Sequence, residues 1–215
     1  MTPAQQNKPT NFCPLCHCVG EPFYRNLFFV CSSCFGIFKA KKFLLNKKDE
    51  QARYENHHND IFDPNYQKFV APITSNVLKN FTKQSLGLDF GAGTGPVISK
   101  ILQDQGYTLN QYDPFFINTP KVLELKYDYI VCCEVIEHFY HPEKEFRLLK
   151  NRLQPNGHLY CMTHIYNPKI DFENWYYKND PTHVFIYQEA TLIWIKNNFN
   201  FTSVTIDNRL ILFVN

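Results

Sequence analysis

A short apolar run that ends in a cluster of glycines places the strongest constraint on how this chain folds. Residues 86–90, LGLDF, have the composition of a buried strand, and the glycine-rich segment 91–95, GAGTG, follows directly. Pro96 then begins a helical pattern that extends to Gln105, and proline is well accepted in the first turn of a helix. Glycine permits positive φ angles and lets a ligand approach the main chain, because it has no Cβ. A strand, a glycine loop and a helix in this order predict a cofactor site.

The spacing of the glycines indicates the kind of cofactor. G-x-G-x-G differs from the G-x-G-x-x-G of dinucleotide folds, and the loop lacks the Lys-Ser/Thr pair of a phosphate loop. Asp113 stands 22 residues after Gly91 and ends the next expected strand. A carboxylate in that position can accept hydrogen bonds from both hydroxyl groups of a ribose. These features favour a nucleoside that carries no pyrophosphate.

Helix and strand patterns alternate from Tyr66 onward. Strands that are separated by helices predict a parallel sheet in an α/β fold, whereas the last two strands form an antiparallel hairpin around 207–209. Pro72 must lie near the start of the first helix or at a kink in it. The expected helices are 66–81, 96–105, 142–153 and 188–198, and the expected strands are 86–90, 108–112, 129–133, 158–162, 201–206 and 210–214.

Four of the eight cysteines have the spacing of a zinc site, C-x2-C, 14 intervening residues and C-x2-C. Each pair presents two thiolates on one tight turn, and two such turns complete a tetrahedral shell for Zn²⁺. The alternative is a pair of disulfides or four buried thiols, which a reducing compartment disfavours. His17 and Cys18 adjoin the first pair and are alternative ligands. The predicted zinc ligands are Cys13, Cys16, Cys31 and Cys34.

Composition and charge exclude several classes of protein. With 44% hydrophobic residues and a net charge of +2, the chain lacks the signature of disorder, and no global field imposes a nucleic acid or an anionic membrane as partner. Its apolar runs are far shorter than the roughly 20 residues of a membrane-spanning helix. The first 12 residues lack the apolar core of a secretory signal. We therefore expect a cytoplasmic protein with no membrane partner.

The distribution of charge suggests the domain boundaries. A lysine-rich stretch at 39–48 follows the cysteines and predicts either a solvated surface or a contact with RNA. We expect a mobile tail at 1–10, a zinc ribbon with a basic extension at 11–48, a linker at 49–65 and an α/β domain at 66–215.

Four segments, taken together, resemble the successive motifs of class I S-adenosylmethionine-dependent methyltransferases. They are LDFGAGTG at 88–95, YDP at 112–114, YDYIVCCEVIEH at 127–138 and LQPNGHL at 153–159. The resemblance covers about residues 66–215. It implies a Rossmann-like sheet in the order 3-2-1-4-5-7-6 with strand 7 antiparallel, to which this chain adds a small N-terminal zinc ribbon.

The same resemblance implies the cofactor and its contacts. S-adenosylmethionine is expected over Gly91, Gly93 and Gly95, with Asp113 on its ribose, and we assign Asp89 and Glu134 to the same site. The chain departs from the family between the second and fourth strands, where the segment is short. The acidic residue that often contacts adenine there has no clear match, so the adenine contacts stay open.

A group of carboxylates and imidazoles predicts a second metal site. Glu134, Glu137 and His138 stand at i, i+3 and i+4, so that one helical turn would place them on one face. With His183 they resemble the metal site of small-RNA 3′-terminal 2′-O-methyltransferases and of ubiquinone-pathway O-methyltransferases, which implies Mg²⁺ or a related ion. A cation lowers the pKa of a bound acceptor oxygen. Two carboxylates with two imidazoles also suit Mn²⁺, Zn²⁺ or Fe²⁺.

The alternative is that this motif only caps a helix and that His138 packs against the cofactor loop. His183 is then the best general base, because a neutral imidazole can take a hydroxyl proton. With the metal site, we assign catalysis to His183, Glu137 and His138. Nearby, Trp175, Tyr176, Tyr177 and Phe185 predict either an aromatic pocket or a hydrophobic lid.

The expected function is therefore methyl transfer from S-adenosylmethionine to an oxygen of a small molecule, with structural zinc and assistance from a second divalent metal. Methylation of RNA, with the zinc ribbon as a docking arm, is an alternative. A third hypothesis is a zinc-ribbon interaction protein that binds S-adenosylmethionine without catalysis.

Overall fold

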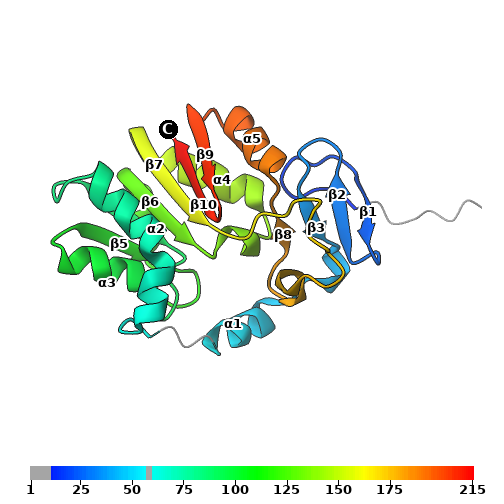
Figure 1. The fold of residues 1–215 in the computed structure, drawn as a ribbon, viewed down its shortest axis with the longest axis horizontal. Coiled ribbons are helices and arrows are strands. Elements are labelled where there is room, and N and C mark those ends of the chain that lie inside the picture. The colour runs from blue at the N-terminus through cyan, green and yellow to red at the C-terminus, as the bar shows by residue number, and fades with distance from the viewer. Residues whose placement is uncertain (1–10, 57–59) are drawn as a thin grey trace, which may run out of the picture.

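The computed structural model describes residues 11–56 and 60–215, in which two sheets are joined side by side (Figure 1). The tail predicted at 1–10 lies outside the described residues. The larger sheet has the order β5-β4-β6-β7-β10-β9. Its first four strands are mutually parallel, and β10 runs antiparallel to both β7 and β9. The strands are β4 (Leu86–Phe90), β5 (Thr108–Tyr112), β6 (Tyr127–Cys133), β7 (Leu153–Met162), β9 (Ser203–Asp207) and β10 (Leu210–Val214).

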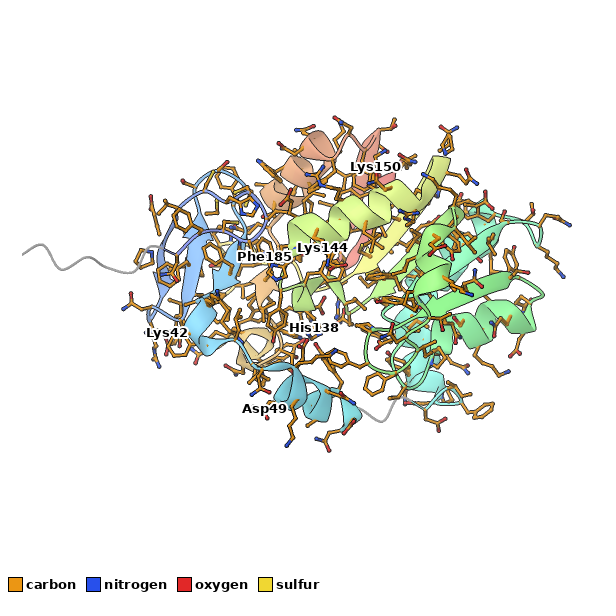
Figure 2. All side chains as sticks on the ribbon, turned by 180° about the vertical axis from the view of Figure 1, so that it is seen from behind. Lys42, Asp49, His138, Lys144, Lys150 and Phe185 are labelled. Carbon is orange, nitrogen blue, oxygen red and sulfur yellow. The ribbon has the colours of Figure 1, made fainter. Side chains whose placement is uncertain are left out.

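Helices cover both faces of this sheet. α2 (Pro64–Asn80) and α3 (Val97–Asp104) lie on one face, and α4 (Pro142–Arg152) and α5 (Glu189–Asn198) lie on the other (Figures 1 and 2). Successive residues of a strand point to opposite faces. Accordingly, Tyr129 and Val131 pack in the core with α2 and α3, whereas Ile130 and Cys132 pack in the core with α4 and α5.

The predicted α/β fold with a Rossmann-like sheet is confirmed, but one strand of the expected order is missing. The observed order matches 3-2-1-4-5-7-6 without the strand numbered 3. Only 14 residues separate β5 from β6, and they include Pro114 and Pro120. They form a turn closed by a bridge between Asp113 and Ile117 and the short 3-10 helix η2 (Pro120–Glu124). Because proline cannot donate to a strand ladder, this short link does not add a strand.

Two element boundaries also differ from the prediction. β7 begins at Leu153 and directly follows α4, so that the strand predicted at 158–162 starts five residues earlier than expected. Pro72 lies inside α2, well after the first helical residue, Pro64. The C-terminal hairpin agrees closely with the prediction, although its first strand begins at Ser203, two residues later than expected.

The second sheet combines the cysteine-rich segment with a strand from far along the chain. We call residues 11–40 the cysteine module. Its strands β1 (Gly20–Tyr24), β2 (Phe28–Cys31) and β3 (Ile37–Lys39) are antiparallel, and β8 (Phe185–Ile186) pairs with β3. The main-chain N–H of Lys39 also donates to the carbonyl of Val184, at 2.9 Å. The module is therefore built into the α/β domain through its sheet.

The aromatic segment around Trp175 packs against the cysteine module. The Phe172 ring makes edge contacts with the rings of Phe23, Tyr24 and Phe28, at centroid distances of 4.8, 5.3 and 5.5 Å. Trp175 joins the same buried cluster. Of the two roles predicted for this segment, the structure favours a hydrophobic contact over a ligand pocket.

Helix α1 (Lys47–Glu55) spans the end of the predicted basic extension and the start of the predicted linker, and it begins after a capping residue. The side chain of Asn46 accepts hydrogen bonds from the N–H groups of Lys48 and Asp49, as expected of an N-cap. The remaining 3-10 turns are η1 (Lys41–Phe43), η3 (Ile136–His138) and η4 (Tyr176–Asn179). None of the helices within 11–56 and 60–215 is long and apolar enough to cross a membrane.

Candidate active site

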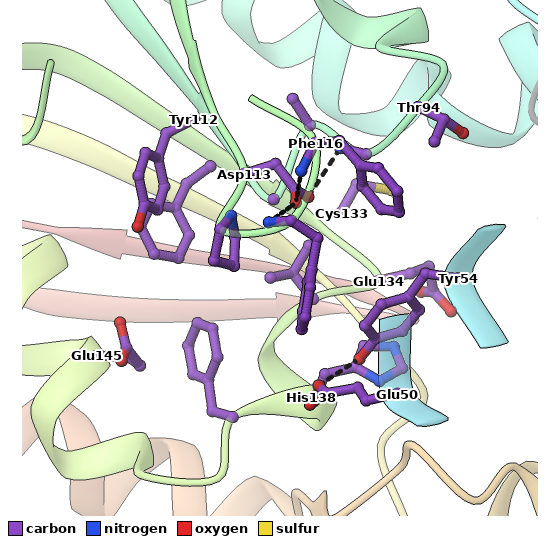
Figure 3. Close-up of a pocket in the computed structure, with 18 of the residues that line it drawn as sticks. Glu50, Tyr54, Thr94, Tyr112, Asp113, Phe116, Cys133, Glu134, His138 and Glu145 are labelled. Carbon is purple, nitrogen blue, oxygen red and sulfur yellow. Dashed lines mark hydrogen bonds between the residues drawn. The ribbon is translucent and has the colours of Figure 1, made fainter. Parts of the chain in front are cut away.

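A cavity of about 580 Å³ lies at the carboxyl ends of β4, β5 and β6 (Figure 3). Its wall is formed by the loops that follow these three strands, together with residues of α1, α2 and α4 and with His183. Ligands of open α/β sheets bind in a crevice at this edge. The volume falls within the usual range of small-molecule sites, roughly 300–1,000 Å³.

Two glycines of the loop after β4 have positive φ angles, and the absence of a Cβ has a different consequence at each. Gly91 has a φ of +80°, and a Cβ there would lie 2.4 Å from the Val135 side chain. Gly93 has a φ of +63°, but no atom lies within 4 Å of the position that its Cβ would take. Gly91 is thus required by packing, whereas Gly93 leaves its main chain open toward the cavity, where a cofactor can approach.

Asp113 ties the glycine loop to the turn after β5. Its Oδ2 accepts a hydrogen bond from the N–H of Gly93 at 3.1 Å, and its Oδ1 accepts from the N–H groups of Phe115 and Phe116 at 2.8 and 3.1 Å (Figure 3). The carboxylate is nearly buried and lines the cavity. Asp113 therefore sets the shape of the cofactor loop from the position predicted for a ribose contact.

Two predicted cofactor residues, Asp89 and Gly95, lie behind the loop and are not among the residues that line the large cavity. They adjoin a much smaller space of about 30 Å³. Asp89 Oδ2 accepts a hydrogen bond from Ser99 Oγ at 2.7 Å, which links β4 to α3. Burial raises the pKa of Asp89 to about 6, although the Ser99 hydrogen bond opposes the shift. The geometry gives Asp89 a role in holding the loop.

Three of the four residues of the predicted second metal site come together. One ligand atom each from Glu137, His138 and His183 lies within 4.8 Å of the others. His138 Nδ1 is 2.9 Å from the carbonyl oxygen of Thr182, and His183 Nδ1 is 2.7 Å from that of Tyr177. A carbonyl only accepts, so each Nδ1 carries the proton and each Nε2 carries the lone pair. Metal-binding histidines are commonly oriented in this way.

The carboxylate of Glu137 is fully buried and only partly hydrogen-bonded. Its Oε1 accepts a hydrogen bond from the Tyr177 hydroxyl at 2.6 Å, and that hydroxyl also contacts Thr163 Oγ1 at 2.7 Å. Its Oε2 has no hydrogen-bond partner, and burial raises the pKa of Glu137. A bound cation would compensate this unsatisfied oxygen. Burial, followed by the charge of His138, lowers the pKa of His183 to about 4, which leaves a neutral imidazole that suits a metal.

Glu134 stands apart from this group. It precedes the 3-10 turn η3 and has a φ of +53°, so that the expected single helical face does not form. Its Oε1 lies 2.6 Å from a guanidinium nitrogen of Arg209, in an ion pair. Burial and the charge of Glu137 raise the pKa of Glu134, and Arg209 opposes them. Glu134 lines the large cavity, where it could face a cofactor.

The four cysteines form one cluster in which every Sγ lies within 4.8 Å of the others. The Sγ atoms are 3.4 Å apart in Cys13–Cys34 and 3.2 Å apart in Cys16–Cys31, well beyond a disulfide bond of about 2.05 Å, and all four cysteines are free. The predicted alternative of two disulfides is therefore not observed.

The two cysteine turns have the same main-chain geometry. The N–H groups of His17 and Phe35 donate to the carbonyls of Cys13 and Cys31, both at 2.9 Å, and both donor residues have a φ of 61°. His17 is exposed, and its ring contacts Glu143 on α4 at 2.8 Å. Two equivalent turns that present four thiolates fit Zn²⁺.

The cysteine module and α1 hold the loop that carries His183. The buried Lys39 donates from Nζ to the carbonyls of Pro181 and Asp180, at 2.8 and 3.3 Å. Arg53 of α1 forms an ion pair with Asp180 at 2.7 Å. The N–H of Val184 donates to the carbonyl of Glu137 at 2.9 Å. The position of His183 thus depends on contacts from the N-terminal part of the chain.

A protein family described as "Methyltransferase domain" matches residues 30–206. The chain belongs to this methyltransferase family. The matched range includes the second cysteine pair and extends through every loop that lines the cavity. No curated protein matches the chain.

Solved structures show the same fold as this methyltransferase domain. An O-methyltransferase family protein from Burkholderia thailandensis superposes with a TM-score of 0.54 at 11% identity, covering 77% of this chain and 61% of that protein. A SAM-dependent methyltransferase from Archaeoglobus fulgidus superposes with a TM-score of 0.54 at 16% identity, covering 69% of this chain and 94% of that one. This chain thus spans less than two thirds of the Burkholderia protein.

The methyltransferase cavity also contains residues that the sequence analysis did not identify. Tyr54 and Glu50 enter the wall from α1, and the Tyr54 ring makes an edge contact with the His138 ring at a centroid distance of 5.4 Å (Figure 3). Phe115 and Phe116 contribute from the turn after β5. The Asn46 cap is a local signal for α1, but nothing in its sequence indicates that it reaches the cavity.

Proposed function

We propose that this protein is an S-adenosylmethionine-dependent methyltransferase that acts on an oxygen of a small molecule. The observation that carries the proposal is the open main chain at Gly93, which faces a cavity of about 580 Å³ at the carboxyl edge of a methyltransferase sheet. Gly91 and Asp113 hold this loop in shape. Glu134 completes the wall on the side of β6.

S-adenosylmethionine, when bound, supplies the methyl group on its sulfonium. Transfer to an oxygen would require the acceptor to approach the methyl carbon from the side opposite the sulfur, so that the carbon–sulfur bond could break as the carbon–oxygen bond forms. The chain therefore has to align the acceptor, exclude water and take up the hydroxyl proton. His138 and His183 adjoin the cavity on the side of α1, and we assign orientation of the acceptor oxygen to them.

We further propose that Glu137, His138 and His183 bind a divalent ion. The supporting observations are the close approach of three donors, the two oriented imidazoles and the unsatisfied Oε2 of Glu137. Such an ion lowers the pKa of an acceptor hydroxyl. Two imidazoles and one carboxylate suit Zn²⁺, Mn²⁺ or Fe²⁺ better than Mg²⁺, which prefers oxygen ligands. This donor set contains one carboxylate fewer than the set predicted from sequence.

For the four cysteines we propose a structural Zn²⁺. The two equivalent turns support a closed four-sulfur site, which leaves no position for a substrate. The module packs against the loop of His183, so we assign it a structural role within the catalytic domain.

The lining of the cavity supports a small-molecule acceptor over RNA. Among the described residues, those in the cavity wall include carboxylates but no lysine or arginine. RNA binding depends on cations that neutralise phosphates. Lys39 is buried against main-chain carbonyls, and the exposed Lys41, Lys42, Lys47 and Lys48 lie outside the cavity wall.

The test combines ion binding with turnover. Purified protein, stripped of loosely held ions, is titrated with Mn²⁺ and assayed for methyl transfer to small molecules of a cell extract. We expect one Mn²⁺ to bind per chain and a chelator to abolish methyl transfer. Glu137→Gln and His183→Ala should bind no Mn²⁺ and should transfer no methyl group. Glu124→Gln, on an exposed residue outside the cavity wall, serves as control. Full activity in both variants, with no effect of the chelator, would contradict metal assistance.

A further inference from the structure

The end of the cavity beside the two histidines is formed by α1 and carries a carboxylate. The Tyr54 hydroxyl donates to Glu50 Oε1 at 3.0 Å, and the Tyr54 ring contacts the His138 ring (Figure 3). The Tyr54 side chain therefore bridges Glu50 and His138, and all three residues line the cavity. Because the glycine loop lies on the opposite side, this end is the one available to an acceptor (Figure 3).

The other carboxylates of the wall have partners or lie elsewhere. Asp113 accepts three main-chain hydrogen bonds, and Glu134 forms an ion pair with Arg209. Glu145 lies on the side of Tyr112, away from His138 (Figure 3). Glu50 is thus the carboxylate that faces the acceptor end.

Among the described residues, no lysine or arginine of the cavity wall balances the charge on Glu50. Lys47, one turn earlier on α1, lies over the Phe115 ring at 5.7 Å and is not one of the cavity-lining residues. Burial raises the pKa of Glu50, and the contacts with Tyr54 and Lys47 only partly oppose this. A positively charged ligand would offset the cost of burial, whereas an anionic ligand would add repulsion.

The neighbouring side chains are aromatic. Tyr54 and Tyr140 contact Glu50, and the Phe115 ring contacts the Tyr54 ring at a centroid distance of 5.6 Å in the same cavity wall. The faces of aromatic rings attract ammonium groups, and the attraction is larger where water is excluded. A carboxylate among aromatic rings is a favourable environment for an organic cation.

We propose that the acceptor is a hydroxylated amine whose ammonium group is recognised by Glu50, while its hydroxyl group faces His138 and His183. Glu50 is therefore the residue that determines specificity for a cationic acceptor. This inference rests on the proposed function, because the position of the acceptor follows from assigning the glycine loop to S-adenosylmethionine.

The experiment measures binding of three phenols that differ in charge. Tyramine carries an ammonium group, 4-(2-hydroxyethyl)phenol is neutral and 4-hydroxyphenylacetate is an anion. Each is titrated into the full chain loaded with zinc and S-adenosylhomocysteine, in the wild type, Glu50→Gln and Glu50→Lys. Glu55→Gln, on the exposed end of the same helix, is the matched control.

We expect tyramine to bind at least tenfold more tightly than the anion, which corresponds to about 1.4 kcal/mol. Glu50→Gln should weaken tyramine tenfold and leave the neutral phenol unchanged, and Glu50→Lys should reverse the order. Equal binding of the three probes, unchanged tyramine binding in Glu50→Gln, or no binding of tyramine would overturn the inference. Binding of S-adenosylhomocysteine is measured separately, and its failure in the wild type would contradict the proposed function itself.

Discussion

Lys39 donates a hydrogen bond from Nζ to the carbonyl of Pro181, at 2.8 Å, two residues before His183. This contact joins the cysteine module to the loop that positions a catalytic candidate. The ammonium group is buried, and burial lowers the pKa of Lys39 to about 8, with the charge of Asp180 opposing the shift. The lysine therefore keeps its charge at neutral pH.

Lys39→Met is expected to loosen this loop without removing the core contacts of the aliphatic side chain. Two carbonyls lose a charged donor, which costs about 1–3 kcal/mol of unfolding free energy. Affinity for Mn²⁺ at the histidine site should fall by about tenfold, as is typical when support of a metal ligand is lost. Calorimetry and urea unfolding measure both effects, with the exposed Lys41→Met as control. Wild-type Mn²⁺ affinity in Lys39→Met would contradict this role.

Removal of one cysteine ligand should affect the site at a distance. Cys31→Ser is expected to lose the bound zinc and to lower the melting temperature, because a structural zinc site contributes directly to folding. Since β3 pairs with β8, Mn²⁺ affinity at His183 should fall as well. Metal analysis and thermal unfolding measure the change, and Cys18→Ser, outside the cluster, is the control. One zinc per chain in Cys31→Ser would argue against the four-cysteine site.

The two glycines should respond differently to substitution. Gly93→Ala places its Cβ in open space, so stability should fall only by the strain of a positive φ, about 1–2 kcal/mol. The affinity for S-adenosylhomocysteine should fall at least tenfold, because the Cβ of the new alanine takes up space that the cofactor needs beside the loop. Gly91→Ala adds a clash with Val135 and should cost about 1–3 kcal/mol more. Calorimetry and urea unfolding separate these effects. Gly93→Ala with unchanged cofactor affinity would place the cofactor elsewhere.

The raised pKa of Asp89 predicts how the unfolding free energy depends on pH. Its pKa is raised by burial from 3.8 to about 6, so between pH 4 and 6 the unfolded chain releases a proton that the folded chain retains. The contribution of Asp89 to the unfolding free energy therefore falls as pH rises through this range, by about 3 kcal/mol in total, and is constant above it.

Asp89→Asn keeps an acceptor for Ser99 but cannot ionise. The unfolding free energy of this variant, relative to wild type, should increase between pH 4 and 6.5. Urea unfolding of both proteins at several pH values measures this difference. The cysteines titrate in the same way in both proteins, so their contribution to the unfolding free energy cancels. A difference that does not change with pH would show that Asp89 has an ordinary pKa.

The features that could be predicted from sequence are those with local causes. The glycine loop follows its strand directly, and the cysteine spacing brings four sulfurs together through two short turns. The C-terminal hairpin likewise depends on adjacent residues, and its strands agree with the prediction closely.

The features that sequence reasoning missed depend on distant partners. α1 reaches the cavity through contacts of Tyr54 with Phe115 and His138, which lie far along the chain. β8 has two residues and exists because it pairs with β3. Glu134 was assigned to a helical face, but its positive φ and its ion pair with Arg209 direct it elsewhere. None of these contacts leaves a periodic pattern in the sequence.

The proposed methyl transfer is tested by following the methyl group. The zinc-loaded protein is incubated with methyl-labelled S-adenosylmethionine and a cell extract, which is then separated into small-molecule, RNA and protein fractions. We expect label in the small-molecule fraction, on an oxygen, and its loss in Gly93→Ala at low cofactor concentration. Label confined to RNA or protein, or no label despite measured binding of S-adenosylmethionine, would contradict this expectation.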